Sequence, residues 1–153
     1  MNSKQEINFG DLRVKQFMTQ RVTCLNADDT IQQAIERMSE ERLAALPVVD
    51  YSDCCLGILS RSDLADLFVG MNEALDSISE SEISFSVDYP DGFGTQVREF
   101  MNPEVVSITA EHSLFEAAQM MAHHHIHHLP VIEASGKLVG IISTLDIARA
   151  VAG

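Results

Sequence analysis

Two Ser-x-x-Asp motifs are the residues of this chain whose types and spacing best suit ligand chemistry. They are Ser60 to Asp63 and Ser143 to Asp146, and each follows an apolar run and opens a stretch with helical spacing. A carboxylate in that place can accept hydrogen bonds from the two vicinal hydroxyls of a ribose. The free amides at a helix start also favour an anionic phosphate. The alternative is that both carboxylates only cap their helices.

The histidines form a second group, because five of the six lie between positions 123 and 128. Neutral imidazoles are good ligands for zinc or nickel. However, His123 and His127 share a face only if a helix continues through the run, and no Cys, Asp or Glu in the run completes a coordination set. We therefore predict no metal site and interpret the run as a polar helix end that leads into a strand. A pH-responsive role stays open, because histidine titrates near neutrality.

Catalysis has little support in the sequence. There is no nucleophile elbow, no P-loop and no HExxH pair. Ser60 and Ser143 have no motif-level base beside them, and a hydrolase built from the histidines and Asp63 has no further feature in its favour. We predict a protein that is not an enzyme, with no catalytic residue and no obligatory cofactor.

The formal net charge of −13 excludes a nucleic-acid surface as the function of this chain. Phosphate contacts along a nucleic acid require clustered Lys and Arg side chains. A phosphorylated small molecule would have to be held locally, against an unfavourable overall field, by residues such as Arg42, Arg61 and Arg149.

The cysteine pattern and the hydropathy indicate a cytoplasmic protein. Three cysteines, with Cys54 and Cys55 adjacent, make a poor disulfide framework and suit a reducing compartment. The first residues lack the apolar core of a signal peptide, and no apolar run is long enough to span a membrane.

The elements that must position these residues occur twice, at an offset of 83 positions. The pairing begins with Val14 opposite Val97, ends with Leu67 opposite Ala150, and needs no gap. Of its 54 residue pairs, 16 are identical. It aligns both Ser-x-x-Asp motifs. Two copies indicate a repeat protein, because each copy alone is too short to bury a good core.

Each copy predicts a strand, a helix, two strands and a second helix, which is an α/β fold. The first strands are expected at 22–25 and 105–108, after short lead-in helices. Ser/Thr-x-x-Glu/Gln capping boxes at Thr30 and Ser113 open the next helices, whose apolar stripes form the core. The predicted boundaries are 11–67 for the first repeat, 68–96 for an acidic linker, and 97–151 for the second repeat. The linker is expected to be solvated, with a partner-specific or lid segment as the alternative.

With these motifs in place, the chain resembles tandem CBS domains, named after cystathionine β-synthase. The resemblance is carried by LPVVD with LGILSRSDL and by HHLPVIE with LVGIISTLDI, and it covers residues 11–151 apart from the linker. It implies two repeats packed around a pseudo-twofold axis. The clefts between such repeats commonly bind AMP, ADP, ATP or S-adenosylmethionine, and such pairs often dimerise.

The resemblance also implies which residues contact a ligand. Beside Ser60, Asp63, Ser143 and Asp146, the positions carried over are Met18, Val22 and Thr23, then Met101, Val105 and Val106, and the tripeptides Leu43-Ala44-Ala45 and Ile126-His127-His128. Small residues in the first tripeptide leave room for a purine, whereas two imidazoles fill the second. In the AMP-activated kinase regulatory subunits a His-Arg pair matching His127-His128 reaches ligand phosphates. A histidine replaces that arginine here, which argues against strong triphosphate binding.

The sequence thus predicts a regulatory module that binds an adenosine-containing ligand, signals by conformational change to a separate effector protein, and forms a homodimer. Two alternatives stay open. One is a structural dimerisation module with an empty cleft, and the other is a metal or pH sensor that uses the histidine run.

Overall fold

The computed structural model of the chain describes residues 8–76 and 96–153, and it divides into two compact units. Unit 1 comprises Met1–Val22, Asp53–Cys55 and Val106–Gly153, and unit 2 comprises Thr23–Ser52 and Leu56–Val105. The larger part of the predicted linker, residues 77–95, lies outside the described residues. Its first residues continue a helix that ends at Asp76.

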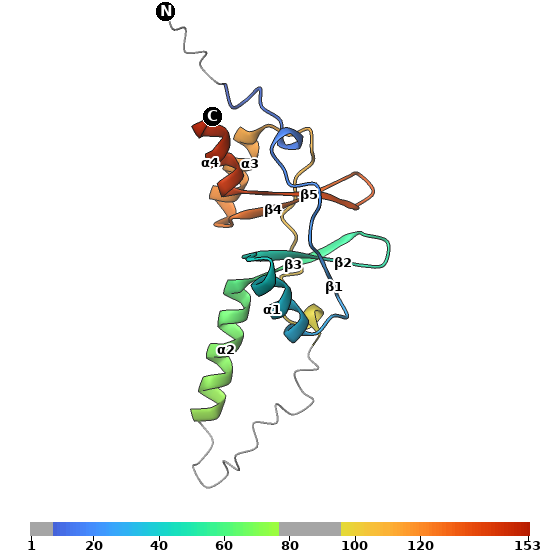
Figure 1. Ribbon diagram of the computed structural model, residues 1–153, viewed down its shortest axis with the longest axis vertical. Helices are drawn as coiled ribbons and strands as arrows, with labels where there is room; N and C mark the ends of the chain where they lie inside the picture. Colours follow the sequence, from blue (N-terminus) through green and yellow to red (C-terminus); the bar gives the residue numbers. More distant parts are fainter. Residues whose placement is uncertain (1–7, 77–95) are drawn as a thin grey trace, which may run out of the picture. The chain divides into compact units, whose positions relative to one another are not determined.

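Unit 2 combines a three-stranded sheet with two helices (Figure 1). Its elements are β1 (Leu25–Asn26), α1 (Ile31–Glu40), β2 (Ala45–Val49), β3 (Cys55–Ser60), α2 (Arg61–Asp76) and the 3-10 turn η3 (Val97–Glu99). β2 is the central strand, and β1 runs parallel to it with Leu25 beside Val48. All five residues of β2 are buried, as expected of a central strand.

Unit 1 is built around an antiparallel hairpin with two helices beside it (Figure 1). Its elements are the 3-10 turn η1 (Val14–Gln16), α3 (Leu114–His124), β4 (His128–Ile132), β5 (Leu138–Ser143) and α4 (Thr144–Ala152). In the hairpin His128 lies opposite Ser143, and Leu129 lies opposite Ile142. Gly136 turns the chain between the strands with a φ of 89°, a conformation that glycine adopts without strain.

The predicted α/β fold is confirmed, but the first strand of each repeat is shorter than expected. In unit 2 only Leu25 and Asn26 form β1, and in unit 1 only Ile108 joins the sheet, as a parallel bridge to Val131. Leu25 and Ile108 are the buried residues of these segments. In the stretches before them no residue is fully buried, and Val106 packs against the core of unit 1 only as a partly buried side chain.

Both predicted capping boxes are confirmed. The Thr30 hydroxyl accepts from the Gln33 amide at 3.2 Å, and the Gln33 side chain accepts from the Thr30 amide at 2.9 Å. Ser113 and Glu116 make the same pair of bonds at 3.1 and 2.8 Å. The hydrogen bonds that the Ser113 amide and hydroxyl donate to the Glu116 carboxylate lower the pKa of this exposed side chain. Both helices thus begin where the sequence indicates.

The lead-in segments are exchanged between the repeats. Val14, in the lead-in of the first repeat, is fully buried in the core of unit 1 beside Leu114 and Leu129. Val97, in the lead-in of the second repeat, is fully buried in the core of unit 2 beside Leu25 and Ile31. Each repeat is thus completed by the other's lead-in. The boundaries 11–67, 68–96 and 97–151, which follow the repeat in the sequence, stay a prediction.

Matching backbone bonds fix each lead-in. In unit 1 the amide of Val14 donates to the carbonyl of His112 at 2.9 Å, and Thr19 exchanges two bonds with Ile141 at 2.9 and 3.0 Å. In unit 2 the amide of Val97 donates to Asp29 at 2.8 Å, and Asn102 exchanges two bonds with Ile58 at 3.0 and 3.3 Å. Each lead-in therefore adds a short antiparallel pairing to the strand of the other repeat.

A glycine in each of these strands lets the lead-in approach. A Cβ at Gly140 would lie 2.7 Å from Met18 Sδ and 3.0 Å from the Thr19 carbonyl oxygen. At Gly57 a Cβ would lie 2.6 Å from the Asn102 carbonyl oxygen. All three distances are shorter than van der Waals contact allows, so Gly57 and Gly140 leave room for the lead-ins.

Within the stretches 8–76 and 96–153, the helices are too short or too polar to cross a membrane.

Candidate functional site

The two Ser-x-x-Asp motifs have the same geometry. Ser143 caps α4, since its hydroxyl oxygen accepts from the Asp146 amide at 3.2 Å. In return Asp146 Oδ2 accepts from the Ser143 amide at 2.8 Å and from its hydroxyl at 2.9 Å. For Ser60 and Asp63 the corresponding distances are 3.2, 2.7 and 2.9 Å.

These hydrogen bonds test the alternative that the two carboxylates only cap their helices. The serine is the N-cap residue, and the aspartate is the reciprocal partner three positions later. In both motifs the cap uses only one carboxylate oxygen, Oδ2. The other oxygen, Oδ1, takes no part in the cap and keeps its capacity as a hydrogen-bond acceptor.

The fold brings each predicted tripeptide to its Ser-x-x-Asp motif. In the first repeat the amide of Arg61 donates to the carbonyl of Ala44 at 2.9 Å. In the second the amide of Thr144 donates to the carbonyl of His127 at 3.0 Å. The first site therefore joins Leu43, Ala44 and Ala45 to Ser60 and Asp63, and the second joins Ile126, His127 and His128 to Ser143 and Asp146.

Of the predicted ligand-binding residues on and before the first strands, only some lie near these sites. Thr23 lies near the first tripeptide, because its hydroxyl donates to the carboxylate of Glu41, two residues before Leu43. Met18 lies against Gly140 of the second repeat, in unit 1. The remaining positions are half-buried and divide between the units: Val22 and Val106 belong to unit 1, and Met101 and Val105 belong to unit 2.

The two tripeptides differ at the side chain that faces solvent. Ala44 and His127 occupy matched positions, and both are exposed. An alanine presents one methyl group there, whereas His127 presents an imidazole. His128 is half-buried, and its burial lowers its pKa; the neighbouring His127 lowers it further, while Asp146 acts in the opposite direction. The second site therefore holds a histidine that resists protonation.

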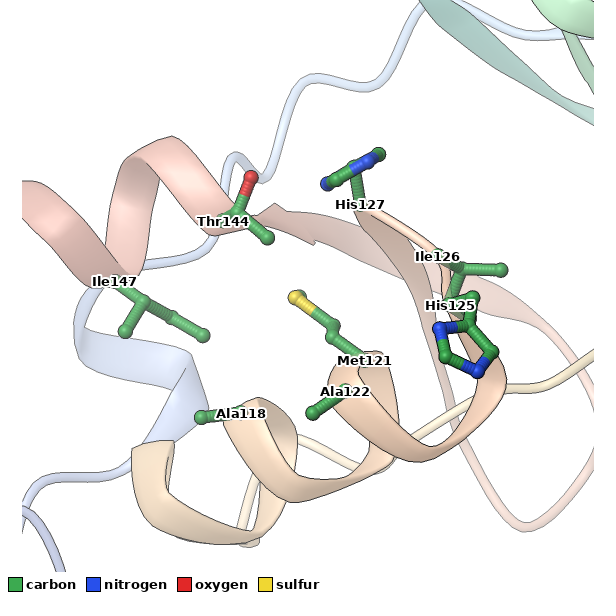
Figure 2. Close-up of a pocket in the computed structure, with 8 residues that line it drawn as sticks. All are labelled: Ala118, Met121, Ala122, His125, Ile126, His127, Thr144 and Ile147. Atoms are coloured by element: carbon green, nitrogen blue, oxygen red, sulfur yellow. The ribbon is translucent and has the colours of Figure 1, made fainter.

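A hollow of about 370 Å³ lies between α3 and α4 of unit 1 (Figure 2). Its lining residues are Ala118, Met121, Ala122, His125, Ile126, His127, Thr144 and Ile147. Figure 2 shows α3 and α4 side chains on facing sides, with His127 beside Thr144 at the rim. The hollow shares Ile126 and His127 with the predicted second site.

This hollow is nevertheless separate from the surroundings of Asp146. Along an α-helix successive residues turn by about 100°, so Thr144 and Ile147 lie on nearly the same face of α4. Asp146 lies about 160° from Thr144 around the helix and is not among the lining residues. Of its lining residues, only Ile126 and His127 belong to the set that the sequence predicts. The signal that could have found it is the pair of small residues Ala118 and Ala122, one turn apart on α3.

The histidine run divides where α3 ends. His125 adopts a left-handed conformation with φ 54° and closes the helix, so His123 and His127 do not share a helical face. His123 and His124 contact each other edge to face, with ring centroids 4.9 Å apart. Over the part of the chain that the structure describes, no group of three His, Cys, Asp or Glu side chains is placed to hold a metal ion.

Comparison with known proteins identifies one family and several similar structures. The family model for the CBS domain matches residues 14–70 and 97–153. The crystal structure of CBSX2, a protein of Arabidopsis thaliana, in complex with AMP has a TM-score of 0.73 and 24% identity, and the match covers 92% of this chain and 96% of that one.

Two further structures are similar over nearly the whole chain. The CBS domain pair of protein MJ0100, in complex with 5′-methylthioadenosine and S-adenosyl-L-methionine, has a TM-score of 0.74 and 19% identity, with 92% and 96% of the two chains covered. Hypoxic Response Protein I, with two coordinated zinc ions, has a TM-score of 0.67 and 26% identity, with 90% and 97% covered. The similarities to CBSX2 and MJ0100 establish the shared fold.

Proposed function

Since the chain belongs to the CBS domain family, we propose that it is a regulatory module that binds an adenosine-containing ligand and acts by conformational change. The observation that carries this proposal is the paired geometry of its Ser-x-x-Asp motifs. In each repeat a carboxylate with one oxygen outside the helix cap lies beside a tripeptide that can border a base. We propose a binding role and no catalytic residue.

Adenosine is the ligand class that this arrangement suits. Its ribose offers two vicinal hydroxyls, which the two lone pairs of Oδ1 can accept together. The flat faces of its base suit a border of small and aliphatic side chains. AMP in CBSX2 and the two ligands of MJ0100 share this adenosine part.

The ligand-binding residues that we propose follow the predicted set in both repeats. In the first repeat they are Met18, Val22, Thr23, Leu43, Ala44, Ala45, Ser60 and Asp63, and in the second they are Met101, Val105, Val106, Ile126, His127, His128, Ser143 and Asp146. The first set is proposed as the stronger site, because the exposed side chain of its tripeptide is a methyl group where the second has an imidazole.

The charge of the chain limits the phosphate part of the ligand. Each phosphate adds negative charge to a protein of formal net charge −13. Arg61 is the basic residue next to Ser60, and it is exposed at the start of α2. We therefore propose AMP or ADP in preference to ATP, with S-adenosylmethionine as the ligand that carries no phosphate.

The signal is proposed to pass through a homodimer or to a separate effector protein. The outward faces of α3 and α4 carry large apolar side chains: Phe115 is 54%, Leu145 is 56% and Val151 is 57% exposed. Exposed apolar side chains that gather on a helix pair are typical of an interaction surface. We propose that a second copy of the chain covers them.

Two measurements on purified protein test this function. Mass spectrometry of small molecules released on denaturation should detect an adenosine compound. Calorimetric titration with AMP, ADP, ATP and S-adenosylmethionine should then give saturable binding for at least one of them. No bound compound and no heat with any of the four would instead favour a structural dimerisation module with an empty cleft.

A further inference from the structure

The two repeats carry different basic groups around their Ser-x-x-Asp motifs. At the offset of 83 positions Arg61, the first residue of α2, matches Thr144, the first residue of α4. Ala45 matches His128 in the same way, so the first repeat has a methyl group where the second has an imidazole. The guanidinium of the first repeat stays charged at any physiological pH, whereas the charge of an imidazole depends on pH.

The hairpin of unit 1 places His128 beside the carboxylate of the second motif. His128 lies opposite Ser143 in the antiparallel pair of β4 and β5. Residues that lie opposite each other in such a pair project their side chains to the same face of the sheet, with Cβ atoms about 5 Å apart. Because the Ser143 hydroxyl donates to Asp146 at 2.9 Å, the imidazole, the hydroxyl and the carboxylate form one cluster.

The strands on either side of β4 add no charge to this cluster. β5 and residues 106–108, which flank β4 on its two sides, carry no charged side chain. The charged and titratable residues on the other elements packed beside the hairpin are His125 and His127 before β4, Glu116, His123 and His124 on α3, Asp146 and Arg149 on α4, and Lys15 and Arg21 on the lead-in.

Burial has the largest influence on the charge of His128. It lowers the pKa of this half-buried imidazole, the neighbouring His127 lowers it further, and Asp146 acts in the opposite direction. Because the ordinary pKa of histidine is 6.5, His128 is neutral at about pH 7 before a ligand binds. The second motif then has an aspartate and a neutral imidazole, where the first has an aspartate and the guanidinium of Arg61.

A phosphate group at the second motif would change the protonation of this imidazole. A phosphate monoester carries between one and two negative charges at about pH 7. Next to Asp146, in a chain of formal net charge −13, that charge is costly unless a positive group compensates it. A negative charge within about 4–6 Å of an imidazole favours its protonated form. Protonation of His128 therefore supplies the positive charge that Arg61 supplies in the first repeat.

From this difference between the repeats we infer that the second site binds a phosphate-bearing adenosine ligand together with a proton, which His128 takes up, whereas the first site binds the ligand without one. This inference rests on the proposed function and specifies how one of the two sites responds to pH. The proton comes from the solvent. By linkage, the affinity of the second site for AMP rises as the pH falls, by up to about tenfold per pH unit for one proton. The protein thus responds jointly to nucleotide and to pH.

Calorimetric titration of the wild type tests the proton uptake without any substitution. AMP and adenosine are titrated to saturation at about pH 7.2, above the range in which the phosphate itself takes up a proton. Each titration is repeated in PIPES and in Tris, whose heats of ionisation differ, so that the difference in heat counts the protons. AMP should take up a few tenths of a proton to about one proton per chain, and adenosine nearly none. Equal heats for AMP in both buffers, or equal uptake with adenosine, would overturn the inference.

Asparagine substitutions locate the proton. Asp63→Asn weakens the first site and should leave the uptake with AMP unchanged. His128→Asn added to D63N should abolish the uptake and flatten the rise in AMP affinity, which should be up to about tenfold between about pH 7.5 and pH 6.5. His123→Asn added to D63N is the matched control at an exposed position on α3, and it should keep both. Uptake that survives H128N, or that disappears in H123N, would overturn the assignment to His128.

The outcomes separate this inference from the function on which it rests. No heat with either AMP or adenosine would overturn the proposed function and the proton uptake together. Saturable binding of AMP to the wild type and to D63N, with the same heat in both buffers, would overturn the proton uptake alone. The comparison of AMP with adenosine uses the wild type only, so it decides the question even where H128N fails to fold.

Discussion

The carboxylates of Asp63 and Asp146 serve two purposes with different atoms. Oδ2 closes the helix cap in both motifs, at 2.7 to 2.9 Å from the serine amide and hydroxyl. Oδ1 stays outside that cap. Capping and ligand binding are therefore compatible at these residues, and the cap fixes the orientation in which the second oxygen is presented.

His128 should make the stability of the protein depend on pH. Its pKa is lowered from the ordinary value of 6.5 by burial and by His127. The unfolded chain therefore takes up a proton at this residue before the folded chain does, so the free energy of unfolding is highest above pH 6.5 and falls as the pH drops below it. Below the lowered pKa, His128 is protonated in both states and should add no further pH dependence to the free energy of unfolding.

Urea denaturation at a series of pH values checks this prediction. His128→Asn should lose less stability than the wild type between about pH 7.5 and pH 5.5, a window above the ordinary carboxyl range. His123→Asn, at an exposed position on α3, is the matched control and should follow the wild type. A wild-type curve that H128N reproduces would contradict the assignment of this dependence to His128.

The exchanged lead-ins are the main structural feature at the scale of elements. Val14 and Val97 are matched positions, and each is fully buried in the core of the other repeat. Val14→Ala should therefore destabilise the second repeat, and Val97→Ala should destabilise the first. Each substitution should lower the free energy of unfolding by about 1–3 kcal/mol, as deletion of buried methyl groups usually does.

Hydrogen exchange measured by mass spectrometry locates the effect. V14A should raise exchange in α3, β4 and β5, whereas V97A should raise it in α1 and β2. The two variants are controls for each other, because each removes the same two methyl groups from an equivalent place. Faster exchange in α1 and β2 of V14A, with α3 unchanged, would contradict the exchange of lead-ins.

Gly140 should be intolerant of a side chain for the same reason. A Cβ there would lie 2.7 Å from Met18 Sδ and 3.0 Å from a backbone oxygen, and the latter cannot give way as a flexible side chain can. Gly140→Ala should lower the free energy of unfolding by about 1–3 kcal/mol, as overpacking does. Gly10→Ala is the control, because its Cβ would meet only the flexible side chain of Asn8, at 3.2 Å. Thermal denaturation of both variants decides the question, and equal stability would contradict the packing role of Gly140.

The sequence predicts local features well and distant pairings poorly. Thr30 and Ser113 are identifiable as cap residues because a capping box lies within four positions. For residues 22–25, β-propensity predicts a full strand, but pairing depends on tertiary packing, and only Leu25 and Asn26 pair. The placement of Val14 in the second repeat has no local signal, because the repeat itself assigns that segment to the first.

The features of the candidate site also divide into those that local sequence predicts and those that depend on distant contacts. The approach of each tripeptide to its Ser-x-x-Asp motif is implied by the family resemblance, and it is realised by the bonds from Arg61 to Ala44 and from Thr144 to His127. Helix periodicity assigns Met121 to the core, where it is buried. The hollow beside it depends on how α3 and α4 meet, which no spacing within one helix determines.

At the scale of the whole molecule, the proposed regulatory function requires that a bound ligand cause a change at the protein surface. Met18 is part of the proposed first site and also lies against Gly140 of the second repeat. A ligand that displaces Met18 would therefore act on a strand of the other repeat. Such a displacement is the kind of conformational change that the proposed function requires.

The most direct test of the central claim is calorimetric titration of Asp63→Asn with AMP. Asparagine keeps an acceptor for the Ser60 cap but replaces the second oxygen with an amide, so the fold should be kept while the ribose hydroxyls no longer find a charged acceptor. Affinity should fall by about one to two decades relative to the wild type, as expected when charge-assisted hydrogen bonds worth roughly 1.5–3 kcal/mol are removed. Asp146→Asn should have a smaller effect. Wild-type affinity in D63N, with an unchanged melting temperature, would contradict the account.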